Sequence, residues 1–214
     1  PSLVMPLARK RLRQMVSHLV LDAEGKALNA KLTEAKEQGY QLNLNLLGEA
    51  VLGEAEAKSR LERTRQMLQN PLVTYASIKA SSVCAQLNPW DVQGNIERLK
   101  DRLRPLYREA MKRSPHAFIN MDMEEYKDLW LTIDLFKDLL SEEEFMPLEA
   151  GIVLQAYLPD TFDALVELAE FAKERRAKGG AKIKIRLVKG ANLSMERVEA
   201  QLHDWAQAPY LSKE

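Results

Sequence analysis

The sequence is poor in the side chains that most often bind metals. Among its 214 residues it has a single cysteine, Cys84, and three histidines. One cysteine cannot form an internal disulfide or build a cysteine-based metal site, which fits a reducing compartment. The histidines are spread along the chain without metal-ligand spacing, at His18, His116 and His203. We therefore expect no metal site.

An excess of charge and a long apolar run are also missing. The 31 basic residues are balanced by 31 acidic residues, so the formal net charge is zero. This balance excludes a broad electrostatic footprint for nucleic acid or for an anionic membrane surface. No apolar run approaches the roughly 20 residues that a helix needs to span a bilayer. With 46% hydrophobic and 29% charged residues, the composition is typical of a folded cytoplasmic protein.

The first 20 residues are basic and partly apolar. The stretch "PSLVMPLARKRLRQMVSHLV" resembles a targeting peptide, but its charges are spread along it and no compact apolar core follows a basic end. We interpret it as an amphipathic helix of the fold. The expected organisation is one domain over residues 1–214, with a helical lead-in over 1–40 and five strand–helix units over 41–214.

Five short stretches have the composition and alternation of strands. They span residues 41–46, 73–81, 117–123, 151–158 and 182–190. Long segments with helical periodicity lie between them, and one ends in "ERRAK" followed by Gly179 and Gly180, a basic last turn and a helix stop. Strands that alternate with helices in this way predict parallel pairing through crossover connections.

The parity of the strands predicts a polar cavity, because successive side chains of a strand point to opposite faces. The faces that turn polar carry Gln41, Asn43 and Asn45; Tyr75, Ser77, Lys79 and Ser81; Phe118, Asn120 and Asp122; Val153, Gln155 and Tyr157; and Lys182, Lys184 and Arg186. An open sheet with helices on both faces would bury these groups at roughly 1–3 kcal/mol each if unpaired. We therefore expect an α/β fold, a partial (βα)8 TIM-type barrel of about five parallel strands with flanking helices, whose polar face opens at the C-terminal mouth.

Two charged residues at predicted strand ends are candidates for chemistry, and each has a structural alternative. Lys79 could bind a carboxylate or form a Schiff base, or it could make an ion pair with Asp122 or another neighbour. Asp122 could orient a substrate amine or a cofactor, or it could cap the helix that follows.

Four further residues lie near the same predicted mouth. Gln155 is an amide on an apolar strand, and a flat cofactor edge or neighbouring backbone would supply the partners that it needs. Arg186 carries a planar donor fork that suits phosphate or a polarised ring carbonyl. Gly190 in "KGANL" would let the backbone approach a ligand at the start of a helix. Glu49 is either a first-turn helix acid or a gate residue over the mouth.

Five motifs, each on a predicted strand or at its end, resemble the flavin-dependent proline dehydrogenase family. They are "LNLLGEAVLGEAEA", "YASIKASSV", "NMDMEEY", "GIVLQAYLPD" and "IRLVKGANLSMERVEA". The resemblance runs from about Met5 to the C-terminus and is strongest to the domain of bacterial bifunctional proline-utilisation enzymes. It implies FAD bound without a covalent link on a distorted (βα)8 barrel. It also implies oxidation of L-proline to 1-pyrroline-5-carboxylate by hydride transfer to the flavin, with a quinone as the electron acceptor.

The resemblance implies roles for individual residues and a location for the protein. Lys79 would pair with the proline carboxylate, Asp122 would line the site near proline and flavin, and Glu49 would be the mouth acid that pairs with a substrate-binding arginine. The flavin would be contacted by Gln155 and Arg186 at its ring and bordered by Val188, Lys189, Gly190 and Ala191. The expected location is cytoplasmic, with peripheral contact at the inner face of the cell membrane left open.

The sequence departs from the family pattern in two ways. Asn192 and Leu193 stand where many members have an aromatic pair, so aromatic packing on the flavin is in doubt. The sequence ends after five strand–helix units, whereas the family barrel has eight and its bifunctional members continue into an aldehyde dehydrogenase domain. We therefore expect the isolated chain to hold FAD weakly or not at all, to have little activity, and to self-associate through open strand edges. A non-catalytic fragment or assembly module, and a different flavin-dependent barrel oxidoreductase, remain as alternatives.

Overall fold

The computed structural model describes residues 4–16, 25–46, 51 and 53–211. The chain divides into two compact units, Pro1–Leu42 and Asn43–Glu214, which are described separately. The described part of the first unit holds α1 (Val4–Val16), which buries none of its residues, and α2 (Gly25–Glu37), which buries two leucines one turn apart. Across the described ranges, no helix has both the length and the apolar character needed to cross a membrane.

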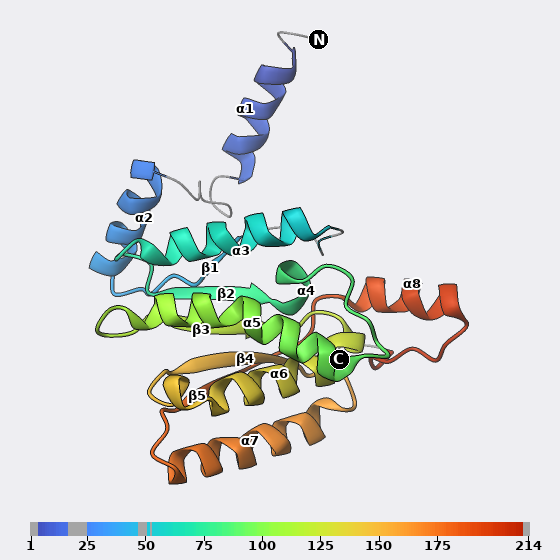
Figure 1. The fold of residues 1–214 in the computed structure, drawn as a ribbon. Coiled ribbons are helices and arrows are strands. Elements are labelled where there is room, and N and C mark those ends of the chain that lie inside the picture. The colour runs from blue at the N-terminus through green and yellow to red at the C-terminus, as the bar shows by residue number, and fades with distance from the viewer. Residues whose placement is uncertain (1–3, 17–24, 47–50, 52, 212–214) are drawn as a thin grey trace. The chain divides into compact units, whose positions relative to one another are not determined.

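The second unit is built on a parallel five-stranded sheet (Figure 1). Its strands lie in sequence order and are β1 (Leu44–Asn45), β2 (Tyr75–Lys79), β3 (Phe118–Asp122), β4 (Ala150–Gln155) and β5 (Ile183–Val188). Every neighbouring pair is parallel, which confirms the predicted strand–helix alternation. β1 is shorter than the stretch predicted for it. Within the described residues, β1 and β5 are the two outer strands of this sheet.

Helices connect the strands and follow the last of them. In the described part of this unit they are α3 (Glu54–Gln69), α4 (Ala80–Val83), α5 (Val92–Met111), α6 (Leu129–Ser141), α7 (Thr161–Ala177) and α8 (Leu193–His203). Two short 3₁₀ turns, Tyr126–Asp128 and Glu143–Phe145, flank α6. Figure 1 shows α3, α5, α6 and α7 running alongside the strands, whereas α8 lies beyond the C-terminal ends of the strands.

The longest helix of this unit, α5, shows why such segments are helical and where the core lies. The Asp91 side chain accepts a hydrogen bond from the Gly94 N–H at 3.0 Å and so caps an amide that has no partner within the helix. Leu99, Leu103 and Leu106 recur at helical spacing and are fully buried. Burial of each of these side chains contributes about 1.5–3 kcal/mol to folding. The packed layer of α3, α5 and α6 therefore holds one face of the sheet in place.

That face of the sheet is apolar. Its residues alternate along β2, β3 and β4 as the parity argument predicts, and the buried ones are Ala76, Ile78, Ile119, Met121, Ile152 and Leu154. The six residues of β4 are all buried, on both faces of the sheet. β5, which is hydrogen-bonded to β4 along its whole length, has no buried residue.

The opposite face is layered, and it becomes more polar toward the C-terminal ends of the strands. The register of β2 and β3 aligns Tyr75 with Phe118, Ser77 with Asn120, and Lys79 with Asp122. The lowest layer is aromatic, with ring centroids 4.8 Å apart and the Lys184 ammonium 5.0 and 5.2 Å from them. The middle layer carries a hydroxyl and an amide, and the top layer carries charges. Within β2, β3, β4 and β5 the parity predicts both faces correctly, but Ser81 lies in α4 and Tyr157 follows the end of β4.

Candidate active site

Charged side chains gather at the C-terminal ends of the strands, which is where parallel α/β folds place their ligands. Lys79 is the last residue of β2, Asp122 is the last residue of β3, and Arg186 lies in the second half of β5. The register that aligns Lys79 with Asp122 brings the first two together across neighbouring strands. The sheet alone therefore assembles three residues that are distant in sequence.

Asp122 and Arg186 form the central ion pair of this site. The guanidinium Nη2 donates to Oδ1 of Asp122 at 2.9 Å. The aspartate side chain is 11% exposed and the arginine side chain is 44% exposed. Burial raises the pKa of Asp122, and the positive charge of Arg186 opposes that rise. The pair thus places a shielded carboxylate beside a guanidinium that a ligand can still reach.

Asp122 also receives hydrogen bonds from the layer beneath it. Its Oδ1 accepts from Asn120 Nδ2 at 2.7 Å and from the Ser77 hydroxyl at 3.3 Å. Its Oδ2 accepts from Asn45 Nδ2 at 3.3 Å. These donors favour the charged form of the carboxyl group. The sequence places all three donors on the polar face but does not single them out as site residues.

Lys79 is paired with Glu124, which the sequence does not single out. Its Nζ lies 2.7 Å from Oε1 of Glu124, a residue that follows β3. The lysine side chain is mostly buried, and the glutamate is the more exposed partner. An ion pair is therefore present, as the structural alternative for Lys79 requires, but the partner is Glu124 and not Asp122. The ammonium is held at the mouth, where a ligand carboxylate could take the place of Glu124.

Gln155 uses backbone partners on both sides. Its Nε2 donates to the Glu124 carbonyl at 2.6 Å, and its Oε1 accepts from the Ala191 N–H at 3.1 Å. The side chain is buried, so these bonds satisfy an amide that would otherwise be costly. Gln155 thus ties the segment after β3 to the segment after β5. The sequence offers neighbouring backbone as one possible partner of Gln155, and the structure shows this partner. Contact between Gln155 and a flavin ring stays a prediction.

The turn after β5 is shaped by a glycine. Gly190 has φ of +123°, and a Cβ there would lie 2.6 Å from ring carbons of Tyr157. The turn is held against the end of β4, because Ala156 N donates to the Val188 carbonyl at 2.7 Å and Tyr157 N donates to the Lys189 carbonyl at 3.1 Å. Only glycine fits this close approach. The neighbouring Lys189 side chain is exposed, so the turn presents one cation and accessible backbone.

The start of α8 lies close to the segment after β3. Asn192 Nδ2 donates to the Glu124 carbonyl at 3.2 Å, and Glu196 in the first turn accepts from the Tyr126 N–H at 2.7 Å. Burial raises the pKa of Glu196. An acid in the first turn weakens the positive field that would attract a phosphate to this helix end. The phosphate-side border over 188–191 therefore stays a prediction.

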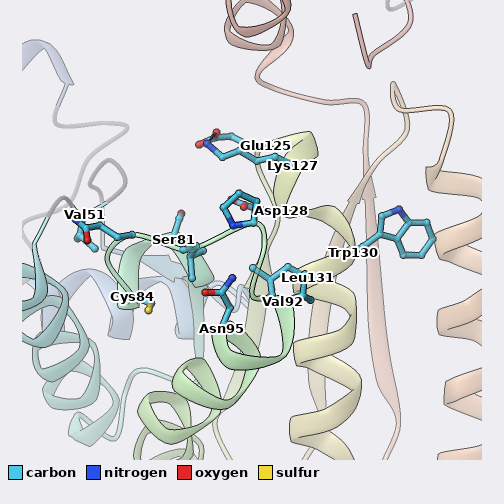
Figure 2. Close-up of a pocket in the computed structure, with 13 residues that line it drawn as sticks. Val51, Ser81, Cys84, Val92, Asn95, Glu125, Lys127, Asp128, Trp130 and Leu131 are labelled. Carbon is cyan, nitrogen blue, oxygen red and sulfur yellow. Dashed lines mark ion pairs between the residues drawn. The ribbon is translucent and has the colours of Figure 1, made fainter. Parts of the chain in front are cut away.

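A cavity of about 450 Å³ adjoins the site (Figure 2). A small crevice lined by Lys79 and Asp122 shares Ser81, Glu125 and Asp128 with the wall of this cavity. Burial raises the pKa of Asp128 to about 6, with smaller contributions from nearby charges. The sequence does not single out Asp128, because its burial depends on tertiary contacts around the cavity that it lines together with residues of α4 and α5.

The metal site and Glu49 are the remaining points of comparison with the sequence. In the described ranges, no group of three or more histidine, cysteine or acidic side chains is arranged to hold a metal ion. Glu49, the predicted mouth acid, lies outside the described residues.

A family model described as proline dehydrogenase matches residues 28–214. The chain belongs to the proline dehydrogenase family. This agrees with the five motifs quoted from the sequence and with the parallel sheet that carries them.

Solved structures and curated proteins of this family give the same result. Proline Utilization A from Corynebacterium freiburgense is 72% identical, with a TM-score of 0.91, over 95% of this chain and 21% of that one. Proline utilization A from Bdellovibrio bacteriovorus, inactivated by N-propargylglycine, is 31% identical with a TM-score of 0.77, over 87% of this chain and 21% of that one. The bifunctional protein PutA of Escherichia coli (strain K12) is 28% identical over 185 residues. The match covers 81% of this chain and 14% of the Escherichia coli protein.

This chain therefore spans about a fifth or less of the length of these proline dehydrogenase relatives. Its sheet with flanking helices is the predicted part of a (βα)8-type barrel, and the predicted fold class is confirmed. The structure brings Lys79, Asp122, Gln155 and Arg186 to one end of the sheet. The roles of these residues toward substrate and cofactor stay predictions.

Proposed function

We propose that this chain takes part in the FAD-dependent oxidation of L-proline to 1-pyrroline-5-carboxylate, with a quinone as the electron acceptor. The observation that carries the proposal is the charge arrangement at the strand ends of a proline dehydrogenase family member. There a lysine and an aspartate lie side by side, and an arginine pairs with the aspartate.

The pair of Lys79 and Asp122 matches the two charges of proline. At neutral pH proline has a carboxylate and a secondary ammonium group. Lys79 would bind the carboxylate in place of Glu124, because a charge-assisted hydrogen bond to a buried ammonium is strong and directional. Asp122 would face the ammonium group and hold it close to the site. An acidic side chain at position 79 and a basic side chain at position 122 would repel this substrate.

The residues that would hold FAD lie in and after β5. Arg186 offers a guanidinium fork that is partly exposed, Lys189 offers an exposed ammonium, and Gly190 brings the backbone close without a side chain in the way. This donor set fits a group with ring carbonyls and a diphosphate. Gln155 would fix the turn through the Ala191 N–H, together with Val188. When bound, FAD supplies the acceptor for the hydride of proline.

The partners follow from the same proposal. Bifunctional relatives bear the printed name PutA, and a natural chain of this kind would carry an aldehyde dehydrogenase domain that consumes the product. A quinone acceptor dissolved in a membrane would place the protein in the cytoplasm with peripheral contact at the inner face of that membrane. Nothing in the charge balance calls for a nucleic-acid partner.

The experiment uses the full-length gene product that contains this chain. Proline oxidation is followed with a dye acceptor, and bound flavin is measured by its absorbance. Lys79→Ala and Arg186→Ala are expected to lower kcat/KM for L-proline by roughly 10–100-fold, because each removes a charge-assisted contact. Lys173→Ala, which removes an exposed ion pair of α7, is the matched control and should leave the rate unchanged.

The possible results separate the parts of the proposal. A wild-type protein that binds no flavin or does not oxidise proline contradicts the function. A wild-type protein that oxidises proline while both alanine variants keep its rate contradicts the assignment of the site.

A further inference from the structure

A polar layer lies directly beneath Asp122 and contains side chains that have no role in the proposed reaction. The sheet register aligns Asn45 with Ser77 and Ser77 with Asn120, across β1, β2 and β3. Ser77 and Asn120 are buried. A row of buried polar groups is costly in a sheet that could have carried valine or alanine at these positions. The free-energy cost of burying Ser77 and Asn120 indicates that these side chains have a role toward the charged residues above them.

We propose that Ser77 and Asn120 are positioning residues, which orient the Asp122 carboxylate toward Arg186 and keep it charged. The inference rests on the proposed function for its catalytic consequence, but its physical content concerns this chain alone. Ser77 and Asn120 act through Asp122.

The hydroxyl of Ser77 has one proton, and its neighbours determine where that proton points. Asn43 Nδ2 donates to Ser77 Oγ at 2.8 Å, and Asn120 Nδ2 lies 3.4 Å from the same oxygen. Both of these groups are donors, so the acceptor near the hydroxyl is Oδ1 of Asp122, at 3.3 Å. A carboxylate accepts this bond best when it is ionised.

The amide of Asn120 is turned to favour the same carboxylate. Its Nδ2 donates to Asp122 Oδ1 at 2.7 Å, while its buried Oδ1 has no hydrogen-bond partner among the described residues. An unsatisfied buried carbonyl oxygen is unfavourable, so the orientation follows the need to give the carboxylate a donor. Gly151 makes room for it, because a Cβ at that position would lie 2.6 Å from Asn120 Oδ1. A side chain at position 151 would force the Asn120 amide to move.

The layer affects more than one residue of the site. Asp122 Oδ1 receives Ser77, Asn120 and the Arg186 guanidinium at the same atom. Loss of either donor beneath it would let the carboxylate rotate and would loosen Arg186, which has only partial burial of its own. The layer therefore sets the geometry on the cofactor side as well as on the substrate side.

The electrostatics agree with this geometry. Burial raises the pKa of Asp122, and the hydrogen bonds from Ser77 and Asn120 oppose the rise after the larger effect of Arg186. The other charged or titratable groups that face Asp122 are Lys79 and Tyr75 on β2 and Glu124 after β3. Arg186 on β5 completes this set. Burial and the negative charge of Glu124 both raise the pKa of Asp122, so removal of Ser77 or Asn120 would let that pKa rise further.

The test measures the titration of Asp122 in this chain by carboxyl ¹³C NMR. Ser77→Ala removes one donor, and Asn120→Asp keeps the shape while replacing a donor with a second acid. Both are expected to raise the pKa of Asp122. Thr64→Val, which removes a hydroxyl that is bonded to the Arg60 carbonyl within α3, is the matched control for loss of a buried hydroxyl and should leave it unchanged. Two well-folded variants with the wild-type titration of Asp122 would overturn the proposal.

Kinetics of the full-length gene product give the second readout. Ser77→Ala is expected to lower kcat/KM for L-proline about tenfold on the acid limb of the pH profile, which corresponds to ~1.4 kcal/mol. The loss should shrink as pH rises, because the acid limb of the profile has moved upward. Ser77→Thr, which keeps the hydroxyl, should have the same pH profile of kcat/KM as the wild-type protein. A loss that is equal at every pH would assign Ser77 a merely structural role. If the wild-type protein does not oxidise proline, the proposed function fails, and the NMR titration still decides the present inference.

Discussion

Two arginines lie at opposite ends of the same pair of strands, β4 and β5, and they are used in opposite ways. Arg175, near the end of α7, is 3% exposed and has no acidic partner among the described residues. Its guanidinium donates to five backbone carbonyls around the N-terminal ends of these strands, those of Leu140, Phe145, Met146, Leu148 and Ala181. Arg186, toward the C-terminal end of β5, is partly exposed and pairs with a carboxylate.

The comparison indicates that the N-terminal ends of these strands serve stability and the C-terminal ends serve ligand binding. At the N-terminal ends of the strands, one buried cation satisfies carbonyls of the segment before β4 and of the segment before β5, so it works as a structural clamp. At the C-terminal ends, the cation is left accessible and its charge is available to a ligand. Barrel folds place stabilising residues at the first end and functional residues at the second. The two ends should therefore respond differently to the same substitution.

The largest expected effect comes from replacing each arginine with methionine, which keeps much of the length and removes the charge. Arg175→Met removes a donor from five carbonyls, three of them in buried hydrogen bonds, and we expect the free energy of unfolding to fall by about 3–5 kcal/mol. Arg186→Met removes a partly exposed ion pair, and the expected loss is about 1 kcal/mol or less. Urea denaturation followed by circular dichroism measures both. Equal losses would show that the two ends of the strands are not specialised.

A second prediction compares two leucines that are register partners on β4 and β5. Leu154 is fully buried, whereas Leu187 beside it is 54% exposed. Leu154→Ala should lower the free energy of unfolding by about 2–4 kcal/mol through lost burial and a new cavity. Leu187→Ala should cost about 0.5 kcal/mol or less, because half of its surface already lies in water.

Thermal or urea unfolding of both alanine variants checks this prediction under one set of conditions. A Leu187 variant that is as destabilised as the Leu154 variant would mean that β5 is covered in solution. In that case the loss for Leu187→Ala should grow with protein concentration if self-association supplies the cover.

The two arginines also mark the limit of what the sequence predicts. Parity places Arg186 on the polar face of its strand, and the structure pairs it with Asp122. The same reading takes "ERRAK" only as a basic last turn of a helix, since nothing local separates the buried Arg175 from its neighbour Arg176. Four of the five carbonyls that bind Arg175 belong to residues 140–148, about 30 residues away in the sequence. Their convergence depends on tertiary packing.

The site shows the same division between local pattern and tertiary contact. Strand parity places Ser77, Lys79, Asn120, Asp122 and Arg186 on the polar faces. The family resemblance adds the ligands expected for Lys79 and Arg186. Neither predicts that Glu124 pairs with Lys79, or that Gly151 makes room for the Asn120 amide. Both contacts involve loop conformation or the absence of an atom, and a hydrophobic pattern carries no signal for them.

The smallest expected effect concerns Asp128, at the functional end of the sheet. Burial raises its pKa to about 6 from an ordinary value near 3.8. The folded state therefore binds this proton more tightly than the unfolded state does, and the protonated form favours folding. That stabilisation is fully present below about pH 4 and is lost as the pH rises through about 6. Among the described residues, Asp128 makes no side-chain cap with α6, so that cap does not stabilise the charged form at neutral pH.

Asp128→Asn keeps the shape of the side chain and removes its titration. We expect the difference in unfolding free energy between variant and wild type to shift by about 1–2 kcal/mol in favour of the variant between pH 4 and pH 7. This is less than the roughly 3 kcal/mol that a full two-unit shift would give, because the carboxyl group keeps some contact with water. Urea titrations at several pH values measure the difference, with Asp163→Asn, an exposed acid in the first turn of α7, as the control. A difference that does not change between pH 4 and pH 7 would place Asp128 in contact with solvent.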